Sequence, residues 1–172
     1  IVTGAGQGIG RAIATAFAEA GANVVLAGMN VKDPEASETQ LRNVARELEA
    51  LGGQTLCVVA DMRRRDDAES LLAQAVSAFG AVDGLVNNVG GGTVPTPFLE
   101  LTPQRWNEGI QQNLKTTYLG CRTVGAYMLE RGSGAIVNVS AIAGIGPSPQ
   151  YAHYGAPKAG VISITRTLAA EL

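Results

Sequence analysis

The sequence predicts an α/β protein with a doubly wound parallel sheet that is flanked by helices. Short apolar runs rich in valine, isoleucine and leucine alternate with longer segments of helical period, which is the pattern of βαβ crossovers. Two Gly/Pro-rich stretches, residues 90–97 and 144–149, each follow a strand candidate. They therefore belong at the carboxyl edge of the sheet, where open α/β sheets bind ligands.

This alternation predicts the elements in order. Strands buried on both faces read as nearly continuous apolar runs, and such runs span residues 1–2, 23–28, 54–60, 82–87 and 135–140. Segments of helical period lie near residues 9–20, 36–51, 66–79, 102–130 and 154–171. The length of 172 residues is ordinary for one domain, so residues 1–172 are expected to form a single domain.

Composition and charge argue against several classes of protein. The net charge is -2, and the dense basic run Arg63 to Arg65 is followed at once by Asp66 and Asp67, which indicates a solvated helix start rather than a nucleic-acid or membrane surface. No apolar segment reaches the roughly 18 residues of a membrane helix. Cys57 and Cys121 lie far apart and suggest no metal set; free thiols are typical of the reducing cytoplasm.

A glycine-rich turn joins the first short strand to the first helix. It runs from Thr3 to Gly10 with the pattern G-x-x-x-G-x-G. Glycines let the backbone approach a pyrophosphate, which the free N–H groups of a helix N-terminus then bind; a loop that merely needs positive φ is the alternative. The residues predicted to bind a dinucleotide here are Gly4, Gly6, Gln7, Gly8, Ile9 and Gly10.

The end of the second strand bears on the choice between NAD and NADP. An acidic residue there binds the ribose 2′-hydroxyl in NAD enzymes and repels a 2′-phosphate. The strand ends in Leu26-Ala27-Gly28-Met29-Asn30, and no acid appears until Asp33. A clear arginine for the phosphate is also absent, although Lys32 is available. The sequence therefore favours NADP over NAD, with Asn30 among the cofactor-binding residues.

Tyr154 and Lys158 form the predicted reaction centre. Their spacing places both side chains on one face of a helix, and Pro157 between them is tolerated only in the first turns of that helix. A phenol with a pKa of about 10 is a poor base at neutral pH, but a nearby ammonium favours its ionised form. Tyr154 can then exchange a proton with a carbonyl or alcohol oxygen while a nicotinamide carries the hydride.

Motifs along the whole chain resemble the short-chain dehydrogenase/reductase family, in its single-domain branch with a Rossmann-like fold. In order, they are the glycine turn, Asp61 after the third strand, Asn87-Asn88-Val89-Gly90, Asn113, and the Tyr154–Lys158 pair. For the cofactor, the resemblance implies that Asp61 binds the adenine together with the following Met62, and that Asn88 and Gly90 line the site.

For catalysis, the resemblance implies that Tyr154 is the general acid/base, that Lys158 assists it and contacts the nicotinamide ribose, and that Asn113 holds a water of the proton relay. The implied function is an NAD(P)-dependent oxidoreductase that transfers a hydride between the cofactor and a secondary alcohol or ketone, a small-molecule partner. The long fourth and fifth helices resemble those that pair subunits in the family, which implies a homo-oligomer. Trp106 is expected to pack the fourth helix, and His153 to be a packing or surface residue.

One position departs from the family pattern. The family's substrate-binding serine would fall at position 141, which is Ala141, and Ser140 stands one residue earlier. Neighbouring strand residues point to opposite faces. Ser140 can replace the donor if the strand end is irregular, Ser148 or a water can substitute, or the protein is slow or inactive. Ser140 is kept as the fourth predicted catalytic residue.

The ends of the sequence suggest a partial chain. It begins at Ile1 without a methionine and stops at Leu172 inside a helix candidate, before the last strands and the mobile substrate loop of the family. A sheet cut there exposes an unpaired edge. The substrate cannot be read, because its specificity depends on residues 93–99, residues 145–151 and that loop. A catalytically weak dinucleotide-binding protein, and an epimerase or dehydratase of the extended branch, are the alternative functions.

Overall fold

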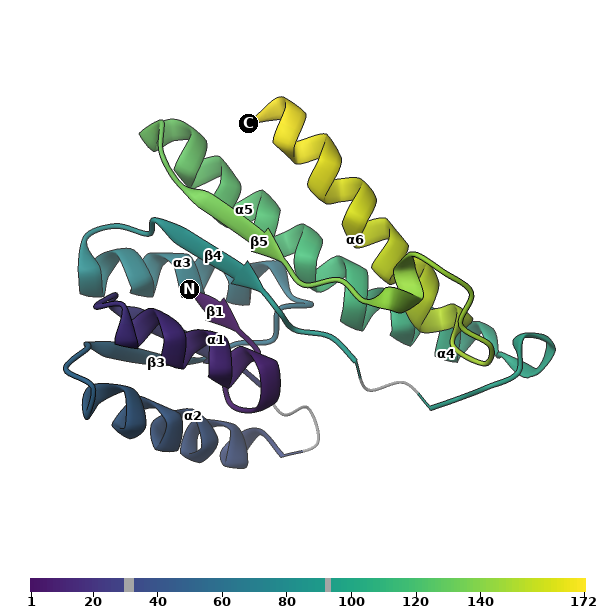
Figure 1. Ribbon diagram of the computed structural model, residues 1–172, viewed down its shortest axis with the longest axis horizontal. Helices are drawn as coiled ribbons and strands as arrows, with labels where there is room; N and C mark the ends of the chain where they lie inside the picture. Colours follow the sequence, from purple (N-terminus) through teal and green to yellow (C-terminus); the bar gives the residue numbers. More distant parts are fainter. Residues whose placement is uncertain (30–32, 92–93) are drawn as a thin grey trace.

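The computed structural model describes residues 1–29, 33–91 and 94–172, and it confirms the α/β fold. In these ranges five parallel strands form one sheet: β1 (Val2–Thr3), β2 (Val24–Gly28), β3 (Thr55–Val59), β4 (Gly84–Asn87) and β5 (Ala135–Asn138). Their order is β3-β2-β1-β4-β5, so the chain first builds toward one edge and then, from β4, toward the other (Figure 1). The reversal beside β1 is the point at which doubly wound sheets bind ligands.

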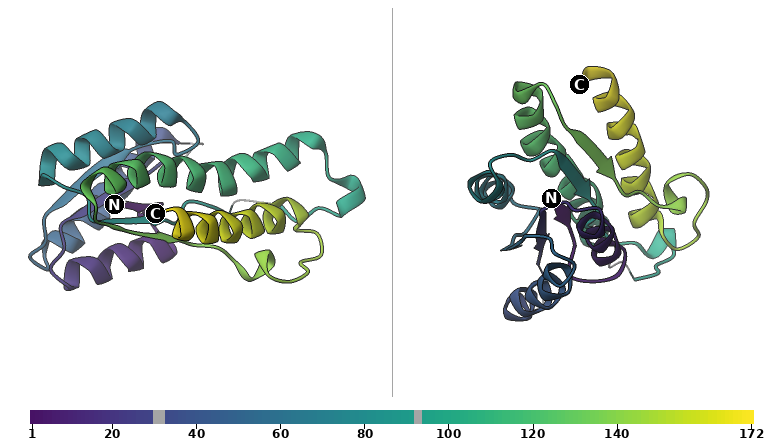
Figure 2. Two further views of the ribbon diagram at one scale, coloured as in Figure 1. Left: turned by 90° about the horizontal axis from the view of Figure 1, so that it is seen from above. Right: turned by 60° about the vertical axis from the view of Figure 1, so that its left-hand side comes forward.

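Six helices accompany this sheet in the described ranges. They are α1 (Gly8–Glu19), α2 (Pro34–Glu49), α3 (Arg65–Phe79), α4 (Pro103–Ile110), α5 (Thr116–Arg131) and α6 (Ala152–Glu171). Helices α1 and α2 lie on one face, α3 and α5 lie on the other, and α6 runs beside α5 next to β5 (Figures 1 and 2). Two 3-10 turns, Phe98–Glu100 and Ile142–Gly144, lie in the loops that follow β4 and β5.

The two faces of the sheet bury separate apolar clusters. In β2, Val24 and Leu26 pack with α1 and α2, whereas Val25 and Ala27 pack with α3 and α5. Successive side chains of a strand point to opposite faces, so a strand that is covered on both faces needs apolar residues at every position. This requirement explains the uninterrupted apolar runs in the sequence.

The structure departs from the expected element bounds at three places near the candidate site. The strand expected over residues 135–140 ends at Asn138, so Ser140 lies beyond it. The segment expected as one helix over residues 102–130 consists of α4 and α5, joined by a π-helical turn over Gln111–Lys115. The last helix begins at Ala152 instead of residue 154, so Tyr154 lies inside it. The π turn inserts an extra residue into the helical ladder without ending the helix, which is why the periodic pattern did not reveal it.

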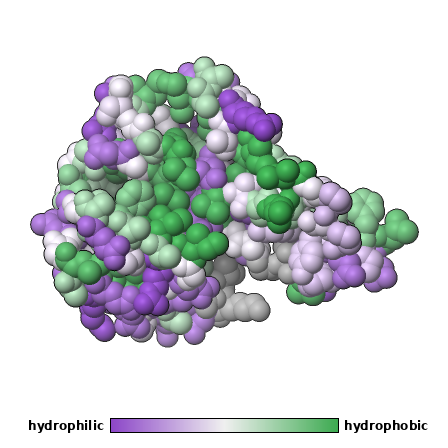
Figure 3. Space-filling view, in the orientation of Figure 1, coloured by the Kyte–Doolittle hydropathy of each residue, from purple (hydrophilic) through white to green (hydrophobic). Residues whose placement is uncertain are grey.

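A hollow of about 440 Å³ lies on the α1 face of the sheet, where it extends from β5 to the amino ends of the strands. Its lining is mostly apolar and comes from α1, β1, β2, β4, β5 and the turns that precede these strands. Figure 3 shows hydrophobic surface gathered in the middle of this face. β5 ends the sheet on this side, and its Val137 is 55% exposed. Across the described ranges, none of the helices has the length and apolar character to span a membrane.

Candidate active site

Tyr154 and Lys158 lie in the first turns of α6, as their spacing predicts. Lys158 is only 3% exposed, and Tyr154 is half-buried. The Lys158 ammonium lies 5.9 Å from the centroid of the Tyr154 ring. It donates a 2.8 Å hydrogen bond to the carbonyl oxygen of Val139, just beyond the end of β5. The pair is therefore held at the carboxyl edge of the sheet.

The electrostatics of Lys158 follow from its burial. Burial lowers the pKa of Lys158 from its ordinary value, because desolvation penalises the charged ammonium. Within the described ranges no carboxylate forms an ion pair with this ammonium. Its charge is thus not neutralised by an acid and lies close to the Tyr154 ring.

A proline and a glycine bring α4 against the start of α6. Pro157 has no amide to donate to the carbonyl of His153, one turn earlier. Gly109 of α4 lies against that carbonyl so closely that a Cβ at position 109 would overlap it. His153 itself is buried, and its Nδ1 has no hydrogen-bond partner among the described residues. The histidine therefore packs between the two helices.

The 3-10 turn after β5 approaches α6 from another side. A Cβ on Gly144 would come within 2.7 Å of the Lys158 backbone, and a Cβ on Gly155 would come within 2.7 Å of the Ala143 carbonyl oxygen. Side chains at these two positions would push the turn and the helix apart. The small residues let the two backbones pack directly, which fixes Tyr154 and Lys158 relative to β5.

Asn113 is fully buried at the centre of the π turn. Its Nδ2 donates to the carbonyl oxygen of Gly109 at 3.1 Å, and its Oδ1 accepts a hydrogen bond from the amide of Gly91 at 2.7 Å. A Cβ on Gly90 would lie 2.8 Å from Asn113 Oδ1 and 2.9 Å from Lys158 Nζ. The structure thus brings three predicted residues, Asn113, Gly90 and Lys158, into one cluster.

Ser140 is close to the pair but its hydroxyl faces the helix. Its Oγ donates a 2.8 Å hydrogen bond to the carbonyl oxygen of Lys158. A hydroxyl has a single proton to donate, so in this arrangement Ser140 does not offer a donor to another oxygen. Ala141 follows in an extended conformation, and Ser148 is half-buried in the next loop. The catalytic role of Ser140 stays a prediction.

The glycine turn is joined to the segment after β4. Asn88 Nδ2 donates to the carbonyl oxygens of Thr3 at 3.1 Å and Gly4 at 3.4 Å, and the Thr3 hydroxyl accepts the amide of Asn88 at 3.0 Å. Gly10 lies against the Gly4 carbonyl so closely that a Cβ would overlap it. Because Asn88 contacts the turn and Gly90 contacts Lys158, one short segment links the two halves of the site.

The turn fits the pyrophosphate of a dinucleotide. Gly4 and Gly8 have φ of 65° and 53°, which glycine adopts without strain, and a Cβ on Gly8 would meet nothing within 4 Å. Gln7 precedes α1 and makes no side-chain cap, and the first turn of α1 holds no acid. The open backbone and the helix N-terminus form the kind of place where an anion binds.

Asp61 and Met62, two of the residues predicted to bind the cofactor, follow the third strand. The Asp61 carboxylate pairs with Arg63, at 2.8 Å to Nε and 2.7 Å to Nη2, and this hydrogen bonding lowers the pKa of Asp61. The side chain of Met62 is buried in the core, so only its backbone can meet a ligand. Asn30 and Lys32 lie outside the described residues.

Two contacts near these motifs were not anticipated from the sequence. Arg63, expected only as part of a solvated basic run, is the partner of Asp61. Gln40 of α2 reaches the glycine turn, where its Nε2 donates to Gln7 Oε1 at 3.4 Å and its side chain lies against Gly6. No local pattern distinguishes Gln40, because the contact depends on how α2 returns across the sheet.

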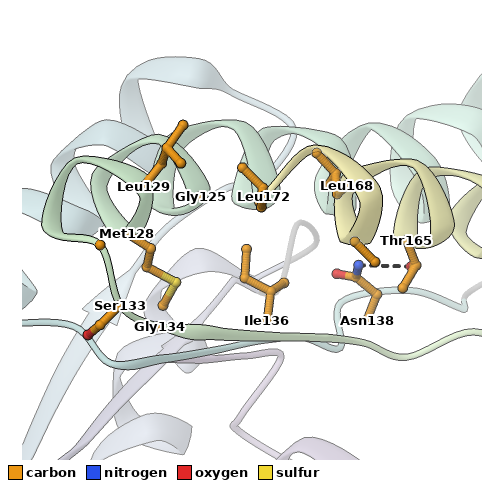
Figure 4. A pocket seen from close by; sticks show the side chains of 12 residues that line it. Gly125, Met128, Leu129, Ser133, Gly134, Ile136, Asn138, Thr165, Leu168 and Leu172 are labelled. Atoms are coloured by element: carbon orange, nitrogen blue, oxygen red, sulfur yellow. Dashed lines mark hydrogen bonds between the residues drawn. The ribbon is translucent and has the colours of Figure 1, made fainter.

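A separate pocket at the other end of α6 lacks chemistry of this kind. It has a volume of about 340 Å³ and lies between α5, β5 and α6 (Figure 4). Met128, Ile136, Leu168 and Leu172 line it, and its polar contact is the hydrogen bond from Asn138 to Thr165 at 3.0 Å. Its lining includes none of the predicted site residues and no charged side chain.

The chain is similar to known proteins over its whole length. The model of the family described as short chain dehydrogenase matches residues 1–172. The chain belongs to this family. A 3-oxoacyl-(acyl-carrier-protein) reductase FabG of Staphylococcus epidermidis is 38% identical over the whole chain, which covers 68% of that relative. A reductase of the same name from Synechocystis is 37% identical, with 67% of its length covered.

Solved structures of the family share the fold. A 3-ketoacyl-ACP reductase from Sinorhizobium meliloti superposes with a TM-score of 0.91 at 36% identity, covering 99% of this chain and 65% of that one. A metagenomic short-chain oxidoreductase in complex with NADP gives 0.88 at 36% identity, covering 99% and 74%. The predictions of the family, of the Rossmann-like fold and of an NAD(P)-dependent class of oxidoreductase are confirmed at this level. The chain spans about two thirds of the length of these relatives.

Proposed function

We propose that the protein containing this chain transfers a hydride between NADP(H) and a ketone or secondary alcohol. The observation that carries the proposal is the Tyr154–Lys158 pair, in which a buried ammonium lies 5.9 Å from the phenol ring. The segment from Asn88 to Gly90 connects this pair to the glycine turn. A dinucleotide on the turn can therefore reach the pair along one edge of the sheet.

The mechanism follows from the groups at this edge. When bound, a nicotinamide would supply the hydride that the carbonyl carbon of the substrate requires. Tyr154 donates its phenolic proton to the carbonyl oxygen, so one hydride and one proton turn the ketone into an alcohol. Lys158 stabilises the phenolate that remains. Asn113, held by Gly91 and Gly109, supports the water that returns the proton.

The substrate class is proposed from the relatives and from the loop after β5. The curated relatives are named as 3-oxoacyl-(acyl-carrier-protein) reductases, whose substrate is a ketone on an acyl thioester. Ile142 and Ile145 follow β5 and are 86% and 80% exposed. Apolar side chains of this kind suit an acyl chain, so a 3-oxoacyl thioester is the first substrate to test.

The test follows NADPH absorbance with the complete gene product that contains residues 1–172. A 3-oxoacyl thioester is expected to be reduced, and Tyr154→Phe is expected to lower kcat by roughly 10²- to 10⁴-fold, the usual contribution of a general acid. The NADPH dissociation constant, measured by fluorescence, stays unchanged. The matched control is Tyr127→Phe, whose ring packs against the apolar core between α3 and α5 and which keeps full activity.

A catalytically weak dinucleotide-binding protein is the second candidate. It is favoured by Ala141 and by the hydrogen bond that directs the Ser140 hydroxyl to the Lys158 carbonyl. Tight NADPH binding without turnover on a broad panel of ketones would support this candidate and overturn the first.

The proposal also includes the choice of cofactor, the extent of the domain, the cellular location and the oligomeric state. NADP is supported by the absence of an acid between Leu26 and Asp33 and by the NADP complex of the metagenomic relative. Residues 1–172 form a single NAD(P)-binding domain.

The free thiols of Cys57 and Cys121 support a cytoplasmic location. A homo-oligomer is proposed from the resemblance of α5 and α6 to the family's subunit-pairing helices, and size-exclusion chromatography tests it.

A further inference from the structure

The loop after β4 and the loop after β5 are tied together beside the start of α6. The amide of Thr96 donates a 2.9 Å hydrogen bond to the carbonyl oxygen of Gln150. Thr96 is only 5% exposed although it lies in a loop. This bond joins the two loops that flank the candidate site, and its donor residue is shielded from water.

The Thr96 side chain is itself held in place. Its hydroxyl donates to the carbonyl oxygen of Val94 at 3.0 Å and accepts a hydrogen bond from Arg105 Nη1 at 2.8 Å. Arg105 lies in the first turn of α4, where its amide donates to the Thr102 cap at 3.3 Å. No carboxylate in the described part of the chain pairs with Arg105. The Arg105 guanidinium therefore binds a neutral loop residue, Thr96, and not a carboxylate.

Gln150 has a backbone conformation that needs such support. Its φ is 67°, and it is the one non-glycine residue with positive φ in the described ranges. A side chain with a Cβ disfavours this region, so it persists where neighbouring groups enforce it, and such residues gather at active sites. The Thr96 amide holds the carbonyl of this residue, which makes the strained turn dependent on the position of Thr96.

The strained turn leads directly into the reaction centre. Tyr151 follows Gln150 and precedes the first residue of α6. Its carbonyl oxygen accepts hydrogen bonds from the amides of Tyr154 at 2.9 Å and Gly155 at 2.7 Å. The direction in which the chain leaves Gln150 therefore sets where the backbone of Tyr154 lies.

We propose that Arg105 and Thr96 are positioning residues that hold Gln150 in its strained turn and so aim Tyr154 at the substrate. This clamp, consisting of Arg105, Thr96 and Gln150, does not contact the glycine turn. Its loss therefore weakens proton transfer and leaves cofactor binding intact. The catalytic part of the inference rests on the proposed function, whereas the structural part does not.

Two pairs of variants of the complete gene product test the clamp. Thr96→Val removes both hydroxyl contacts at constant shape, and Thr96→Ser restores them. Arg105→Met removes the guanidinium from an exposed position, so it tests the clamp even if Thr96→Val fails to fold. Arg46→Met, at an exposed arginine of α2 that donates to Asn43 of the same helix at 3.2 Å, is the matched control.

The first measurement does not need activity. Hydrogen exchange of the Tyr154 and Gly155 amides is expected to be at least about tenfold faster in Thr96→Val and Arg105→Met than in the parent. Thr96→Ser and Arg46→Met keep the parental exchange, and NADPH affinity is unchanged throughout. Unchanged exchange at these two amides in both disrupting variants would overturn the clamp, whether or not the protein reduces any ketone.

The second measurement uses turnover. In the disrupting variants kcat falls roughly 10- to 100-fold, since small displacements of a reacting group cost this much. The pH at which kcat is half-maximal also shifts, because the Tyr154–Lys158 geometry changes. A loss of folded protein alone would lower activity without moving that pH. Faster exchange in a protein without turnover would keep the clamp and reject the proposed function; normal kcat and pH profile in both variants would reject the clamp.

Discussion

Lys158 combines burial with the absence of an acidic partner in the described part of the chain. Its side chain is almost excluded from water, and its ammonium bonds to the Val139 carbonyl oxygen at 2.8 Å. Burial lowers its pKa below the ordinary 10.5. This lowering costs folding free energy, because the folded state holds the proton of Lys158 less tightly than the unfolded chain does.

This linkage predicts how stability depends on pH. Between the lowered pKa and 10.5 the unfolded chain binds more protons, so the free energy of unfolding rises with pH in that window. The substitution Lys158→Met removes the pH-dependent contribution of this residue to the free energy of unfolding. We expect urea unfolding from neutral to alkaline pH to show the parent gaining stability relative to the variant as pH rises. A constant difference between the two across this range would contradict the lowered pKa.

Ala141 offers a second prediction at the residue scale. Because the Ser140 hydroxyl is engaged by Lys158, Ala141→Ser should supply the missing donor and raise kcat toward the roughly 10²- to 10³-fold that one such donor contributes elsewhere. Steady-state turnover of a ketone measures the gain. Ser148→Ala tests the alternative that Ser148 already serves. No increase with Ala141→Ser would mean that a water or another hydroxyl has replaced the serine.

Single residues show what a sequence can reveal of the site. The four-residue spacing of Tyr154 and Lys158 was sufficient to place them on one helix face, and the structure places them so. The burial of His153 was not predictable, because it depends on Gly109 from a distant helix. The direction of the Ser140 hydroxyl depends likewise on a carbonyl of α6 rather than on its own strand.

At the scale of elements, the helix from α4 to α5 shows what the hydrophobic pattern could not predict. Its ends were nearly right, but the π turn over Gln111–Lys115 was missed. The pattern of apolar residues shows which face of a helix is buried. One inserted residue changes this pattern too little to be detected. Asn113 in the π turn bonds to Gly109 within the same helix, but its contact with Gly91 exists only when this helix packs against the loop after β4.

The crossing of α4 and α6 gives a prediction at this scale. Gly109→Ala places a Cβ onto the His153 carbonyl, so the helices must separate. We expect a loss of about 1–3 kcal/mol of stability, as for other overpacked contacts, together with a fall in kcat because Tyr154 moves. Thermal unfolding and steady-state kinetics measure the two effects. Gly146→Ala, where a Cβ meets nothing within 4 Å, is the control; equal behaviour of both variants would refute the crossing.

At the scale of the molecule, the order of strands and helices followed from the alternation of apolar runs and helical segments. The sheet order β3-β2-β1-β4-β5 is the arrangement that the doubly wound prediction requires. What the pattern could not show is how completely each strand is covered. β5 has the same apolar character as β2, yet Val137 on it is 55% exposed, because burial depends on what lies beyond the edge.

The hollow beside β5 predicts how residues 1–172 behave when they are expressed alone. An exposed edge strand and an apolar hollow of about 440 Å³ favour association between chains over a cooperative native state. We expect a broad thermal transition with aggregation, and no increase in Tm when NADPH is added. The complete gene product is expected to gain about 2.7 kcal/mol at 100 times the dissociation constant of NADPH. A sharp transition of the isolated 172 residues that NADPH shifts upward would show that the sheet needs nothing further at β5.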